Sequence, residues 1–214
     1  MPIEDQNTQS RYQMLITRIF NRNKANKNFV TVVSGLPRSG TSMMMQILAA
    51  GGISPITDNV RVADEDNAKG YYEHEEVKSL AKGKHDCLNN AEGRTIKVIS
   101  SLLKHLPDDR HYKVIFMNRQ LDEVLASQAK MLINLDKAGH FDNDAELKVL
   151  YQTHVKTLKK WLQRQSNIDV LHLNYHDVIA EPSNNIDSIV NFLQVQANID
   201  AMTAVVDRDM RHHR

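Results

Sequence analysis

The sequence contains a single cysteine, Cys87, among 214 residues. One cysteine excludes a disulfide within the chain and a zinc site built from several cysteines. We interpret Cys87 as a structural thiol, because no partner that would make it a nucleophile can be identified in the sequence.

Long apolar runs and an excess of charge of one sign are also missing. No apolar run approaches the roughly 18 residues of a membrane span, and the polar start MPIEDQNTQS does not have the pattern of a signal peptide. We therefore expect a cytoplasmic protein with no integral membrane segment. The formal net charge is +1, so no overall field favours a nucleic-acid partner, and any basic patch must be local.

The length and the ordinary composition, 41% hydrophobic and 25% charged, predict one globular domain over residues 1–214. Residues 1–28 are expected to form an amphipathic helix, at residues 11–22, and a polar connector. This helix would pack on the domain or on a partner subunit in a homodimer, or, because it is basic, on a membrane surface. The core is expected at residues 29–193, followed by a C-terminal tail at 194–214.

Within the core, apolar runs and helical periods alternate. Strands are expected at residues 29–34, 95–100, 112–117 and 169–173, and helices at 42–50, 73–80, 121–135, 145–164 and 181–193. Such alternation predicts an α/β three-layer sandwich with a mostly parallel sheet, of the P-loop NTPase-like kind. Residues 53–72 have no clear period and are expected to form a loop over the sheet edge at which ligands bind.

The stretch VTVVSGLPRSGTSMMM passes from a buried strand through a glycine-bearing loop into a helix. Backbone N–H groups of such a loop and of the first helical turn converge on one anion. The spacing Gly35-x4-Gly40-x-Ser42 fits the phosphate-loop pattern, except that Thr41 stands where an NTPase carries lysine. The cation in this loop is Arg38.

Ligands of parallel sheets bind beyond the carboxyl ends of the strands. At the end of the third expected strand lies Arg119, so two cations, Arg38 and Arg119, suit a ligand with two separated anionic groups. An NTPase would also need an acidic residue at that strand end to hold magnesium. The strand YKVIFM ends in Asn118-Arg119 instead, so we expect no metal site and disfavour a metal-dependent nucleotide hydrolase.

The segment SGLPRSGTS followed by a helix resembles the phosphosulfate-binding loop of sulfotransferases, whose donor is 3′-phosphoadenosine 5′-phosphosulfate (PAPS). The segment VIFMNRQLDEVLAS is similar to the family's second motif, and LNYHDVIAEPSNNIDSIVNFL to a later one, so the resemblance covers residues 29–193. It implies three sets of contacts with the donor: the 5′-phosphosulfate on Arg38, Ser39, Gly40, Thr41 and Ser42, the 3′-phosphate on Arg119 and Ser127, and the adenine near Tyr175.

On the acceptor side the match to the family is weaker. Many members have Lys-Thr-His at the end of the second strand, where the histidine is the base; here Lys97 matches the lysine, but Ile99 takes the place of the histidine. Another branch of the family uses a carboxylate after the phosphate loop, which favours Glu73 as the base, with His74 as the second choice. Lys97 and Arg38 would stabilise the departing phosphate.

The resemblance implies transfer of a sulfuryl group from PAPS to a hydroxyl or amine of a small-molecule, glycan or peptide acceptor, with release of 3′-phosphoadenosine 5′-phosphate (PAP). A sulfuryl group carries less charge than a terminal phosphate, so N–H donors with Arg or Lys can stabilise its transfer without metal. Two alternatives remain: a P-loop small-molecule kinase that uses ATP and magnesium, and a catalytically inactive nucleotide-binding module, which the missing histidine favours.

Overall fold

The computed structural model describes residues 28–58, 72–134 and 144–209. The expected N-terminal helix at residues 11–22 and most of the expected loop before Tyr72 lie outside these ranges. Within the described part of the chain, no helix is both long and apolar enough to cross a membrane.

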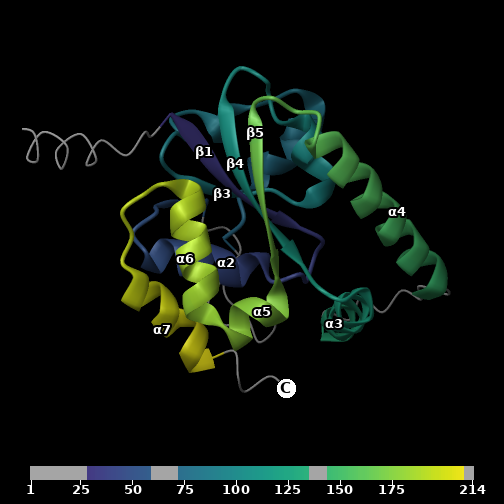
Figure 1. The fold of residues 1–214 in the computed structure, drawn as a ribbon. Helices are drawn as coiled ribbons and strands as arrows, with labels where there is room; N and C mark the ends of the chain where they lie inside the picture. The colour runs from purple at the N-terminus through teal and green to yellow at the C-terminus, as the bar shows by residue number, and fades with distance from the viewer. Residues whose placement is uncertain (1–27, 59–71, 135–143, 210–214) are drawn as a thin grey trace, which may run out of the picture.

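The centre of the fold is a five-stranded sheet in the order β2-β3-β1-β4-β5, in which all neighbouring strands are parallel (Figure 1). The strands are β1 (Phe29–Gly35), β2 (Pro55–Ile56), β3 (Thr95–Lys97), β4 (His111–Asn118) and β5 (Ile168–Asn174). Every residue of β1 is buried, because β1 is the middle strand and both of its faces are covered. The predicted α/β sandwich with a mostly parallel sheet is confirmed.

Helices cover both faces of the sheet, which makes three layers (Figure 1). One face packs against α2 (Thr41–Ala50), α5 (Tyr175–Ala180), α6 (Pro182–Leu193) and α7 (Ile199–Asp209). The other face packs against α4 (Asp144–Leu162) and the 3₁₀ helices η1 (Glu75–Lys82), η2 (Asp86–Leu88) and η3 (Ser100–His105). Helix α3 (Leu121–Asn134) follows β4 beyond the carboxyl end of that strand.

The helix after the phosphate-loop sequence is built as its residues predict. Met43, Met44 and Met45 are buried in the core. The helix ends in a left-handed cap, since Gly52 has φ +90° and the N–H of Ile53 donates to the carbonyl of Leu48.

The structure differs from the predicted elements in several places, and β2, η2 and α5 were not predicted. The second long strand is shorter than expected, because β3 stops at Lys97 and the next residues turn into η3, which directs Leu103 into the core. The expected helix at residues 73–80 is the 3₁₀ helix η1. The C-terminal tail contains α7, whose Met202 packs so closely on Gly51 that a Cβ there would lie 2.6 Å from the methionine sulfur.

Candidate functional site

The loop between β1 and α2 is shaped by close contacts at its two glycines. Gly40 has φ +94°, and a Cβ on it would lie 2.5 Å from Cδ2 of Tyr175. A Cβ on Gly35 would overlap the Ser39 hydroxyl and lie 2.7 Å from the carbonyl oxygen of Met117. Only glycine fits at these points, so the backbone itself lines the loop.

The N-terminus of α2 faces this loop without a capping side chain. Gly40 is the N-cap, and no acidic residue lies in the first helical turn. The bond from the Met44 N–H to the Gly40 carbonyl begins the helical pattern, so the amides of Thr41, Ser42 and Met43 precede it and their dipoles favour an anion. Ser39 is buried, and its hydroxyl has no hydrogen-bond partner among the described residues.

Lys97 brings a buried positive charge to the start of α2. The residue is 8% exposed and stands at the carboxyl end of β3, paired in register with Val33 of β1. Its Nζ donates to Oγ of Ser42 at 3.1 Å and lies 3.2 Å from Oε1 of Glu73. The structure therefore brings together two predicted catalytic residues, Glu73 and Lys97, and one predicted donor-binding residue, Ser42.

A second group of predicted residues meets where the loop contacts α3. Arg38 is in the left-handed region, with φ +67°, and its Nε donates to Oγ of Ser127 at 2.9 Å. Arg119 follows β4, and its Nη1 donates to the carbonyl of Arg38 at 3.1 Å. Three of the predicted donor-binding residues are thus joined, with the Arg38 side chain directed toward α3.

Arg119 is also held by residues that were not predicted from the sequence. Its Nε donates to Oε2 of Glu123 at 2.9 Å, one helical turn further on. Nε2 of His176 lies 2.8 Å from both carboxylate oxygens of Glu123. The hydrogen bond from Arg119, and then the contact with His176, lowers the pKa of Glu123. The i, i+4 spacing of Arg119 and Glu123 was a signal for this pair; nothing local pointed to His176.

Tyr175 was expected near an adenine ring, and the structure places it against the phosphate loop. A Cβ on Gly40 would lie 2.5 Å from its ring edge, and its ring centroid lies 4.2 Å from the guanidinium carbon of Arg119. Tyr175 therefore supports both the loop and the arginine.

The second choice of base, His74, lies beside Asp58. Its Nδ1 is 4.0 Å from the carboxylate of Asp58, too far for a hydrogen bond, and has no such partner among the described residues. Asp58 instead accepts a hydrogen bond from the N–H of Glu75, and Thr57 donates to the carbonyl of Glu73. These two bonds fix the backbone on either side of His74.

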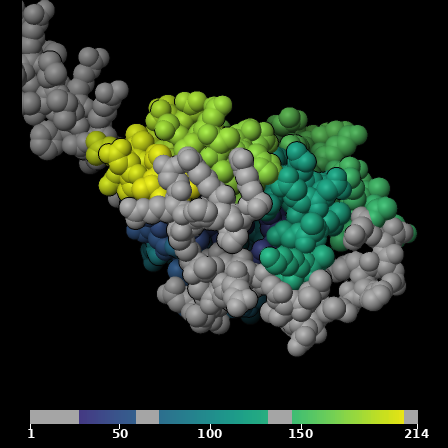
Figure 2. All heavy atoms as spheres, turned by 90° about the horizontal axis from the view of Figure 1, so that it is seen from below, coloured from purple at the N-terminus to yellow at the C-terminus, as the bar shows by residue number. Residues whose placement is uncertain are grey.

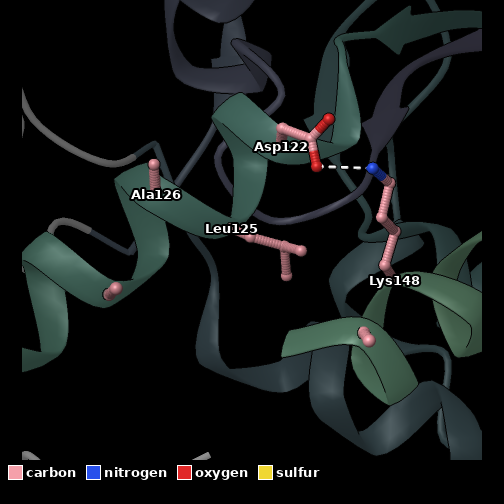
Figure 3. Close-up of a pocket in the computed structure, with 6 residues that line it drawn as sticks. Asp122, Leu125, Ala126 and Lys148 are labelled. Carbon is pink, nitrogen blue, oxygen red and sulfur yellow. Dashed lines mark hydrogen bonds and ion pairs between the residues drawn. The ribbon is translucent and has the colours of Figure 1, made fainter. Parts of the chain in front are cut away.

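A hollow of about 320 Å³ lies between α3 and α4. Figure 3 shows Asp122 and Lys148 paired across it, at 2.6 Å, with Leu125 below. None of the predicted site residues lines it.

In Figure 2, purple atoms from the start of the described core show between the teal atoms of α3 and the yellow-green atoms of the C-terminal helices.

The residues that the structure describes include no cluster of three or more His, Cys, Asp or Glu side chains able to hold a metal ion. The cations and N–H donors around the β1–α2 loop instead suit an anionic ligand.

The model of the sulfotransferase domain family matches residues 30–211. The chain belongs to this family. The resemblance seen in the motifs is thereby confirmed, and the sulfotransferase match extends beyond the predicted core through α7. No curated protein sequence matches this sulfotransferase-family chain. A solved structure of retinol dehydratase, in complex with androsterone and inactive cofactor PAP, has a TM-score of 0.48 and 20% sequence identity, and the match covers 86% of this chain. The chain spans 66% of the length of that protein.

Proposed function

We propose that the protein transfers the sulfuryl group of PAPS to a hydroxyl or amine of an acceptor and releases PAP. The observation that carries this proposal is the buried ammonium of Lys97, 3.1 Å from Ser42 at the open N-terminus of α2. Burying a charge is unfavourable unless partners compensate it. A lysine held at this position suits an anion bound in the loop.

The position of Lys97 also explains why Thr41 can replace the lysine of an NTPase loop. The charge that an NTPase supplies from the loop itself comes here from the neighbouring strand β3. Strand β4 ends in Asn118 and the chain continues with Arg119, without the carboxylate that would hold magnesium on a nucleoside triphosphate. These features favour a metal-independent transfer over a kinase reaction.

In the proposed complex the 5′-phosphosulfate lies in the β1–α2 loop, on the amides of Gly40, Thr41 and Ser42. The buried hydroxyl of Ser39, which has no hydrogen-bond partner in the described part of the chain, and the close-packed backbone at Gly40 fit such a group. Arg119 and Ser127 bind the 3′-phosphate. Arg38 joins the two regions, since it belongs to the loop but contacts Ser127.

The proposed reaction is a direct displacement at sulfur. The acceptor oxygen or nitrogen forms a bond to sulfur while the bond between sulfur and the 5′-phosphate oxygen breaks. Glu73 takes the acceptor proton, and Lys97 stabilises the negative charge on the departing phosphate, with Arg38 contributing positive charge from the loop. Because Lys97 contacts both Glu73 and Ser42, it also holds the base beside the phosphate loop.

The proposal is tested by following labelled sulfuryl transfer from PAPS to a panel of phenols, alcohols and amines. We expect sulfuryl transfer to at least one class of acceptor. In a Glu73→Gln variant the rate of transfer should fall about 100-fold or more, while the affinity for PAP changes little. Glu75→Gln is the matched control, because Glu75 pairs with Lys78 at the surface. An unimpaired Glu73→Gln variant would exclude Glu73 as the base. Tight PAP binding without transfer to any acceptor would favour the inactive nucleotide-binding module.

A further inference from the structure

The guanidinium of Arg119 is held on three sides before any ligand binds. Nε donates to Glu123, Nη1 donates to the carbonyl of Arg38, and the guanidinium face lies on the ring of Tyr175. These contacts come from α3, from the β1–α2 loop and from α5. An arginine fixed in this way loses little side-chain freedom when it binds an anion.

The cost of this arrangement is a carboxylate beside a phosphate site. Glu123 lies in the first turn of α3, between Arg119 and the rest of the helix that carries Ser127. A carboxylate repels a bound phosphate and competes with it for the arginine. His176 is the group that changes this balance, because its Nε2 lies 2.8 Å from both oxygens of Glu123.

We propose that Glu123 and His176 act as positioning residues for Arg119, and that the charge of His176 sets how tightly the 3′-phosphate of the donor binds. This inference rests on the proposed function, in which Arg119 and Ser127 bind that phosphate. When His176 is protonated, it neutralises Glu123, and Arg119 offers its full charge to the ligand. When His176 is neutral, Glu123 is compensated by Arg119 alone.

Histidine is the side chain that ordinarily changes charge near neutral pH, so pH is the variable that tests this contact. Two other carboxylates lie on or next to α5, the helix that carries His176. On α5, Asp177 accepts a hydrogen bond from Asn174, and Glu181, which precedes α6, accepts one from Asn184. The lowered pKa of Glu123 keeps it ionised near neutral pH.

The expected size of the effect is modest, because water screens the pair. The side chain of His176 is 54% exposed and that of Glu123 is 32% exposed. Partly exposed charge pairs of this kind change an equilibrium by up to about fivefold. We therefore expect removal of the histidine to weaken PAP binding about three- to fivefold in acid and to leave it unchanged in base.

The test is isothermal titration of PAP into the wild-type protein and a His176→Gln variant at pH 5.5, 7.0 and 8.5. The ratio of the two dissociation constants is the quantity compared, because the titration of the ligand's own phosphate, with a pKa near 6, cancels in it. We expect the ratio to fall from about three to five at pH 5.5 to about one at pH 8.5. His172→Gln is the matched control: His172 contacts Phe116, and its ratio should stay near one.

A Glu123→Gln background shows whether His176 acts through Glu123. In that background, the ratio of the PAP dissociation constants measured with and without His176→Gln should not change with pH. A flat ratio in the wild-type background would overturn the inference, and so would an unchanged pH dependence in the Glu123→Gln background. If the wild-type protein does not bind PAP at all, the proposed function fails together with this inference. If it binds PAP and the ratio is flat, this inference fails alone.

Discussion

Replacing Lys97 with methionine tests whether its charge serves the ligand or only the fold. Methionine keeps much of the side-chain volume and removes the ammonium that contacts Ser42 and Glu73. A hydrogen bond to a charged group contributes about 1.5–3 kcal/mol. We therefore expect Lys97→Met to weaken PAP binding about 10- to 100-fold.

The same substitution should also destabilise the protein, since it leaves the carboxylate of Glu73 without its ammonium partner. The side chain of Glu73 is 33% exposed, so water can replace part of the lost interaction. We expect a loss of about 1–2 kcal/mol in the free energy of unfolding. Adding Glu73→Gln removes the carboxylate that lost the contact with Lys97 and should recover most of this loss, while PAP binding stays weak.

The measurements are urea denaturation for the free energy of unfolding and isothermal titration for PAP affinity, on both single variants and the double variant. Lys113→Met is the matched control. Lys113 is partly buried near the opposite end of β4, where its Nζ donates to the carbonyl of Phe192 and lies over the ring of Phe29. The Lys113→Met variant should lose stability and keep its affinity for PAP. Recovery of PAP binding in the double variant would refute the role given to Lys97.

Two further predictions concern the loop glycine Gly40 and the partly buried His154. Gly40→Ala should abolish PAP binding, because Gly40 has φ +94° and the new Cβ would collide with Tyr175. The control is Gly52→Ala, where φ is +90° and a Cβ would meet nothing within 4 Å; this variant should lose about 1 kcal/mol of stability and keep PAP binding. Equal PAP affinities in the two variants would contradict the role given to Gly40. Burial, and then the positive charge of Lys104, lowers the pKa of His154, so the unfolded chain binds its proton more readily and stability falls as pH drops below about 6.5. Urea denaturation at pH 7 and pH 5 should show a smaller fall in the free energy of unfolding for His154→Gln than for the wild-type protein. An equal fall in the two proteins would contradict the role given to His154.

The parts of the fold that could be predicted are those that depend on residues close together in the sequence. A continuous apolar run marks the buried strand β1, and the glycine spacing after it marks the loop. The helix that follows is equally clear, down to its cap at Gly52. In these stretches neighbouring residues determine the backbone, so one sequence is enough.

What could not be predicted depends on packing between distant segments. The burial of Lys97 follows from the register of β3 with β1, which the sequence alone does not show. The pairing of Glu123 with His176 joins residues 53 positions apart. Helix α7 was missed because Met202 and Val206 form a short apolar stripe, whose burial depends on the space left by Gly51.

The most direct test of the account is a pair of isothermal titrations on the wild-type protein, one with PAP and no metal, the other with ATP and magnesium. An anion site built from Lys97, Arg38 and Arg119 predicts that PAP binds tightly and that a chelator does not change its affinity. It also predicts that ATP binds weakly. Binding of ATP with magnesium, together with no binding of PAP, would contradict the account and favour a phosphate-loop kinase.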